Sequence, residues 1–222
     1  TGIVGSSSVI AIVLGILKTK VIAVILGPFG VGVSGLLQSI IDLVRSFTSF
    51  GLSTSSVIDI AQHNNEESRE ELGKILSALH RLTILTGVLG SLVIFVFATY
   101  FSRFTFGSTD YILHIRIISG VVLIVSLTEE KNAILQGMRA IKYMAWQKIA
   151  SAVVGLVVCI ALYYFFGNAG IVPVLVCVNL FALIISFSFC SRLKVRRIHI
   201  SFADTFRIGR NMLWVGFFLI LS

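Results

Sequence analysis

Long apolar runs, separated by short polar or glycine-rich stretches, dominate the sequence. A transmembrane helix needs about 20 mostly apolar residues, and six such runs can be placed along the chain. The predicted spans cover approximately residues 3–26, 33–60, 82–102, 111–127, 149–166 and 171–191, and a seventh begins near residue 211. This pattern predicts an all-α integral membrane protein, a polytopic helical bundle. We expect residues 1–210 to form a six-span lobe and residues 211–222 to begin a second lobe.

Glycine and proline clusters mark two of the boundaries. Gly27-Pro28-Phe29-Gly30-Val31-Gly32 follows the first run, and Gly167-Asn168-Ala169-Gly170 divides an uncharged run that is about twice as long as one span requires. We expect a turn at each cluster. The fourth helix is expected to continue past its apolar part through Glu129, Glu130 and Lys131.

The composition supports a membrane protein. Hydrophobic residues make up 56% of the chain and charged residues 13%, with a mean hydropathy of +0.99. Soluble domains are about 45–50% apolar and about 25% charged, so an ordinary soluble domain is excluded. The net charge of +8 does not predict a nucleic-acid partner, because the cations lie mainly between the apolar runs. The three cysteines lie within apolar stretches and are expected to be packing residues.

The distribution of Lys and Arg predicts the orientation. Thirteen of the 18 lie after the second, fourth and sixth spans, whereas the loops after the odd-numbered spans contain Arg103 alone. Cytoplasmic loops are enriched in Lys and Arg, so the amino terminus is predicted to be cytoplasmic. Four cations remain inside the predicted spans, namely Lys18, Lys20, Arg45 and Arg116.

A charge at the centre of a membrane helix costs about 2.5 to 3.5 kcal/mol on insertion scales and usually faces a protein interior or a wet cavity. In the second span, small and polar residues recur at helical spacing and form a stripe. This stripe comprises Gly35, Gln38, Ser39, Asp42, Arg45, Ser46, Ser49, Ser53 and Ser56. If it faces Lys18 and Arg116, the spans form a cationic site that attracts an anion, and Arg binds phosphate oxygens bidentately.

Simpler interpretations remain open for each of these charges. Asp42 and Arg45 can neutralise each other within their helix. Lys18 can extend to the membrane interface, as can Lys20, and Arg116 can anchor its span there. Glu129, Glu130 and Lys131 can be a solvated helix end. The sequence contains no H-E-x-x-H, G-x-S-x-G or Walker A motif, so we expect neither an enzyme nor a cofactor.

Three stretches resemble the Wzx-type polysaccharide flippases (O-antigen translocases), which share a superfamily with the multidrug and toxin extrusion (MATE) transporters. They are residues 17–32, residues 35–40 followed by Phe50-Gly51-Leu52, and residues 133–139. The resemblance implies a MATE-like fold of two lobes around a central cavity, of which this chain is about the first half. It further implies alternating access in the bacterial inner membrane, with an undecaprenyl-diphosphate-linked oligosaccharide as substrate. Membrane lipids, a polysaccharide polymerase and a chain-length regulator are the other expected partners.

On this interpretation, Lys18, Arg45 and Arg116 contact the diphosphate or an acidic sugar, and Asp42 orients Arg45. Asp42 and Glu130 are the candidates for a coupling-ion site. One rival is a cation-coupled multidrug or metabolite exporter of the MATE branch, whose cavity should be more acidic or aromatic. A second rival is a non-transporting membrane scaffold of polysaccharide assembly, in which the polar stripe would be wholly packed against protein.

Overall fold

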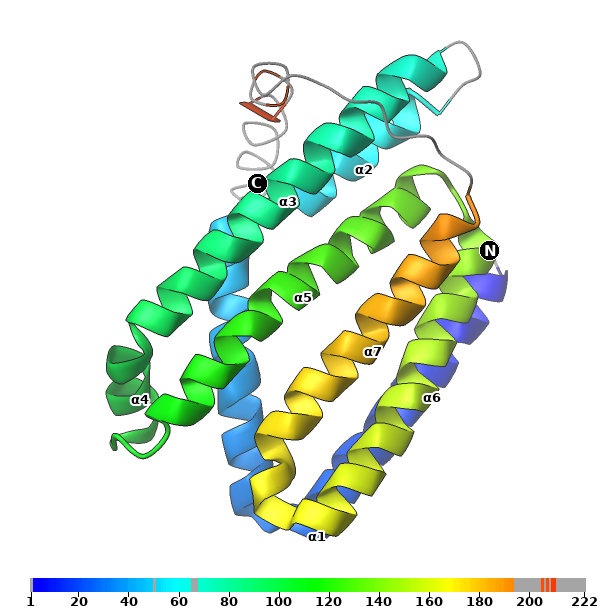
Figure 1. Ribbon diagram of the computed structural model, residues 1–222. Coiled ribbons are helices and arrows are strands. Elements are labelled where there is room, and N and C mark those ends of the chain that lie inside the picture. Colours follow the sequence, from blue (N-terminus) through cyan, green and yellow to red (C-terminus); the bar gives the residue numbers. More distant parts are fainter. Residues whose placement is uncertain are drawn as a thin grey trace.

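The computed structural model describes residues 2–49, 51–64 and 68–193, together with residues 205, 207, 209 and 210. Within these residues the elements are helical, in the order α1 (Gly2–Ser49), α2 (Leu52–Gln62), α3 (Arg69–Val96), α4 (Ala98–Phe106), α5 (Ile112–Gly137), α6 (Ile141–Phe166), the 3-10 helix η2 (Gly167–Gly170) and α7 (Ile171–Ser191) (Figure 1). The all-α class is confirmed. The predicted seventh span and the boundary at residue 211 lie outside the described residues.

Both predicted turns are present. Gly27 interrupts α1 with a non-helical backbone (φ 68°, ψ −176°), and Pro28 follows it. Figure 1 shows the first half of α1 running beside α6 and the second half returning behind α3 and α5. At the second turn, Gly167 also has a positive φ, of 51°. Glycine adopts this conformation without the steric cost that a Cβ atom brings.

The predicted second and third spans differ from the structure, and the third is also divided at Phe97, between α3 and α4. The second span, expected to run unbroken to Ile60, is interrupted at Gly51, whose left-handed backbone (φ 67°) precedes α2. The third span, expected to begin at Leu82, is part of a helix that begins at Arg69. This helix extends through the polar stretch because one of its faces buries Leu72 and Leu76 against neighbouring helices. The expected continuation of the fourth helix is confirmed, since α5 runs to Gly137.

Apolar contacts hold the helices together in two clusters. The larger cluster joins the second half of α1 to α3, α5, α6 and α7, and the smaller one joins α2, α3 and α5. Small residues allow helices to approach closely in membrane bundles. A Cβ atom on Gly137 would lie 2.6 Å from side-chain atoms of Ile60, so α2 and α5 touch at that point.

The outer surface carries many large apolar side chains, including Ile12, Leu92 and Phe187. Four stretches are long and apolar enough to cross a membrane, namely Val9–Ser49, Arg69–Val96, Ile112–Gly137 and Ile141–Ser191. The first and last of these contain the turns at Gly27 and at Gly167–Gly170. Each therefore supplies two crossings, as the sequence predicts, and the chain is a multi-pass membrane protein.

Candidate functional site

The second half of α1 has one apolar and one polar face. Its apolar face packs into the larger core cluster through residues such as Leu37, Ile41 and Val44. The opposite side, which we call the polar face, exposes Gly35, Ser39 and Ser46 and leaves Gln38, Asp42 and Arg45 half-buried. This part of the polar stripe points away from the core of the lobe, whereas Ser53 and Ser56 lie on α2, where Ser56 is buried. Charged groups on such a face require water or further protein rather than lipid.

Arg45 on the polar face forms an ion pair with Glu129 of α5. Both side chains are partly shielded, with 21% and 32% of their surface exposed. The Nε atom of Arg45 is buried and has no hydrogen-bond partner among the described residues. A buried unsatisfied donor indicates an unseen water or ion, and the exposed part of the Arg45 side chain remains accessible to an anion.

Asp42 was expected to orient Arg45, but its carboxylate has a different partner. Its two carboxylate oxygens accept hydrogen bonds from Nε2 of Gln38, at 3.3 and 3.2 Å. Gln38 and Asp42 are four residues apart and therefore neighbours on the helix surface. The carboxylate that orients Arg45 comes instead from Glu129 on another helix.

Glu130, adjacent to Glu129, faces the interior. Its side chain is 0% exposed and accepts hydrogen bonds from Nζ of Lys131 at 2.7 Å and from Nδ1 of His80 on α3 at 2.8 Å. Lys131 is itself buried and lies 6.0 Å from the ring centroid of Phe187 on α7. The interpretation of these residues as a solvated helix end is therefore wrong for Glu130 and Lys131. The extension of α3 beyond its apolar part covers them.

Lys18 and Arg116 lie elsewhere on the lobe. Lys18 is half-buried on the first half of α1, near Cys159 of α6. Arg116 is exposed, and its guanidinium lies 5.5 Å from the ring centroid of Phe95 on α3. At 1.5 Å per residue, Arg116 is about 20 Å along α5 from Glu129, the partner of Arg45. The four predicted residues therefore do not form one compact site within this lobe.

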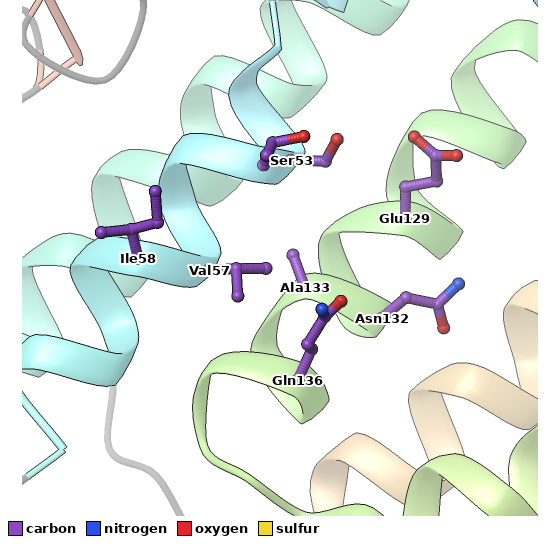
Figure 2. A pocket seen from close by; sticks show the side chains of 8 residues that line it. Ser53, Val57, Ile58, Glu129, Asn132, Ala133 and Gln136 are labelled. Atoms are coloured by element: carbon purple, nitrogen blue, oxygen red, sulfur yellow. The ribbon is translucent and has the colours of Figure 1, made fainter. Parts of the chain in front are cut away.

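A pocket opens between α2 and α5 beside Glu129. It has a volume of about 320 Å³ and is lined by Ser53, Thr54, Val57, Ile58, Glu129, Asn132, Ala133 and Gln136. Figure 2 shows Ser53 and Val57 of α2 facing Glu129 and Ala133 of α5 across the opening. Sequence reasoning identified Ser53 as part of the stripe and missed the amides of Asn132 and Gln136. Their spacing from Glu129, at three and seven residues, places all three on one face of α5.

A much smaller cavity separates the two glutamates. It has a volume of about 20 Å³, enough for one water molecule, and lies among α1, α2, α3 and α5. Its lining consists of Glu129, Glu130, Leu52, Leu79 and the hydroxyl residues Ser49, Ser53, Thr83, Thr86 and Ser126. Within the described part of the chain, no cluster of His, Cys, Asp and Glu is arranged to hold a metal ion.

Comparison with known proteins identifies the family. The family described as "Polysaccharide biosynthesis protein" matches residues 1–222. A solved structure of similar fold is a MOP superfamily transporter from Pyrococcus furiosus Vc1, whose reverse-polarity binding pocket is said to suggest a different function. The TM-score is 0.73 at 16% sequence identity, over 95% of this chain and 48% of that one. No curated protein matches the chain.

This chain therefore spans about half the length of that transporter. Because the sequence identity is low, the structural match shows that the fold is similar and nothing more. The family match covers every residue of the chain. The chain belongs to the polysaccharide biosynthesis protein family and has the fold of one half of a MOP superfamily transporter.

Proposed function

We propose that the intact protein is a lipid-linked oligosaccharide flippase of the bacterial inner membrane. It moves undecaprenyl-diphosphate-linked repeat units, of the O-antigen or a related polysaccharide, from the cytoplasmic to the periplasmic leaflet by alternating access. The family match supports a role in polysaccharide biosynthesis. The observation that carries the proposal is Arg45, a partly shielded cation on an open polar face with one buried donor unused.

The guanidinium of Arg45 suits a diphosphate. Arg presents its donors in a planar fork that matches phosphate oxygens. Glu129 accepts from one terminal nitrogen and fixes the orientation of the fork, while part of the Arg45 side chain remains exposed. The exposed hydroxyls of Ser39 and Ser46 on the same face can keep the surrounding space hydrated. An anionic headgroup that moves from bulk water to the polar face can therefore keep part of its hydrogen bonding.

The positions of Lys18 and Arg116 suit successive contacts along a transport path better than one shared binding site. Arg116 is separated from the level of Arg45 by about 20 Å along α5, and Lys18 lies on the other half of α1. A diphosphate that crosses the membrane would meet such cations in succession. The Lys and Arg distribution predicts a cytoplasmic amino terminus, and with that orientation Arg45 would act before Arg116.

Asp42 remains the better placed candidate for a coupling-ion site. Its carboxylate is half-buried on the polar face, where Gln38 is its partner. Glu130, the other candidate, is closed in by Lys131 and His80. An ion that enters from a central cavity would reach Asp42 directly.

The test is the full-length protein carrying Arg45→Ala, expressed in its own host. We expect surface polysaccharide to fall at least tenfold, while the variant reaches the membrane in wild-type amounts. Arg45→Lys keeps the charge but loses the fork and should give an intermediate level. Lys20→Ala is the matched control, because Lys20 is exposed and lies off the polar face. Unchanged export in Arg45→Ala would contradict the proposal.

A further inference from the structure

We propose that the pocket between α2 and α5 binds an uncharged, hydroxyl-rich sugar ring of the substrate, next to the diphosphate at Arg45. This inference rests on the proposed function and adds a second recognition site to it. The pocket is the part of the lobe that distinguishes a glycosylated lipid from a bare lipid diphosphate.

The packing of the two helices creates the pocket. In Figure 1, α2 and α5 run in the same direction, and they touch where Gly137 meets Ile60. Moving back along both helices from this contact, Val57 and Ala133, and then Ser53 and Glu129, lie on opposite walls. The space between these walls is about 320 Å³. This volume is at the lower end of the range of about 300–1,000 Å³ for small-molecule pockets.

The lining is mainly apolar, with a few polar groups and little net charge. Of the eight lining residues, Glu129 is the charged one, and it is already neutralised by Arg45. The other polar groups are the hydroxyls of Ser53 and Thr54 and the amides of Asn132 and Gln136. Hydroxyls and amides both donate and accept hydrogen bonds. This set suits a neutral ligand with several hydroxyl groups better than an ion.

One lining atom has an unused hydrogen-bonding capacity. The Oδ1 atom of Asn132 is buried and, among the described residues, has no hydrogen-bond partner. A buried acceptor left unsatisfied costs about 1–3 kcal/mol. A water molecule that bridges this atom to a ligand would remove this cost. The apolar side chains of Val57, Ile58 and Ala133 supply surface for the C–H groups of a ring.

The position of Glu129 connects the pocket to the proposed phosphate site. Its carboxylate pairs with Arg45, and the same residue lines the pocket. A ligand with its phosphate on Arg45 therefore has the atoms attached to that phosphate at the mouth of the pocket. In a glycosylated lipid diphosphate, those atoms belong to the first sugar. Along the protein, Arg45 is followed by Glu129 and then by the amides of the pocket. In the substrate, the phosphate is likewise followed by the first sugar.

The experiment compares two probes on purified full-length protein in lipid nanodiscs. One probe is glycan-free undecaprenyl diphosphate, and the other is the lipid-linked oligosaccharide fraction extracted from the host. The variant is Asn132→Leu with Gln136→Leu. Asn179→Leu is the matched control, because this amide on α7 donates to the backbone of Leu175 and does not line the pocket. Gln136→Leu alone, at an exposed position, serves if the double variant fails to fold.

For the wild-type protein we expect tighter binding of the glycosylated probe. The double variant should bind that probe at least tenfold more weakly and the glycan-free lipid within twofold of the wild type, while Asn179→Leu changes neither. Equal effects on both probes, or no effect on either, would overturn the sugar site and leave the proposed function standing. Failure of the wild-type protein to bind either probe would overturn both.

Discussion

Glu129 and Glu130 are neighbours on α5, yet the structure gives them opposite environments. Glu129 points to the polar face of α1, where it pairs with Arg45 and keeps 32% of its side chain exposed. Glu130 points to the interior, where its side chain is 0% exposed and accepts hydrogen bonds from His80 and Lys131. Successive residues on a helix differ by about 100° in direction. One turn of α5 therefore supplies both a partly exposed carboxylate and a buried one.

The largest effect is expected from Glu130→Ala. Removing one partner of a buried ion pair leaves an uncompensated charge and typically costs about 3–5 kcal/mol. The charge left behind is Lys131, whose side chain is 4% exposed. We expect little folded full-length protein, measured by size-exclusion chromatography of the solubilised membrane fraction. Wild-type yield and thermal stability would show that Glu130 is not a structural group.

The double variant Glu130→Gln with Lys131→Met separates charge from shape. Replacing both members of a buried ion pair by neutral groups of similar size is often close to neutral. We expect less than half the stability loss of Glu130→Ala, measured as thermal unfolding of the same detergent-solubilised protein. A loss as large as that of the single variant would mean that the hydrogen-bond geometry, not the charge, stabilises this cluster.

Glu129→Gln should affect binding more than folding. A partly exposed ion pair contributes about 0.2–1 kcal/mol to stability, so the melting temperature should remain near that of the wild type. Loss of the carboxylate charge leaves the guanidinium of Arg45 less firmly oriented, so glycan-free undecaprenyl diphosphate should bind at least threefold more weakly. Unchanged or tighter binding would indicate that Glu129 competes with the ligand rather than positioning Arg45.

The smallest effect is expected at the Glu70–Lys74 pair on α3. The two charged atoms are 2.7 Å apart, but 72% and 42% of the side chains are exposed. Exposed ion pairs contribute little because water and salt screen them. Glu70→Gln should leave surface polysaccharide and thermal stability unchanged. A marked loss of either would show that distance, rather than burial, governs the charged pairs of this lobe.

Periodicity and composition predicted the membrane class, the turns at Gly27 and at Gly167–Gly170, and the polar stripe of the second span. These features depend on local sequence, because apolar length and helical spacing determine them. The break at Gly51 was missed because a lone glycine within an otherwise helical pattern does not by itself end a helix.

The partners of the charged residues could not be predicted. Arg45 and Asp42 are close in sequence, which favoured a local pair. In the structure, Arg45 instead forms an ion pair with Glu129 on a different helix. His80 lies fifty residues from Glu130 in the chain. Such pairs depend on the rotation of each helix about its axis, which tertiary packing sets. The amides of the pocket were missed for the same reason.

Water access to the polar face tests the central claim most directly. Ser46→Cys places a thiol on that face, whereas Leu92→Cys on α3 exposes one among apolar neighbours, and Thr109→Cys marks the exposed turn between α4 and α5. In full-length protein without native cysteines, a water-soluble maleimide should label Ser46→Cys and Thr109→Cys and leave Leu92→Cys unmodified. Host lipid-linked oligosaccharide should slow labelling at Ser46→Cys alone. Labelling at Thr109→Cys but not at Ser46→Cys would mean that this face is packed against protein, and would contradict a transport cavity.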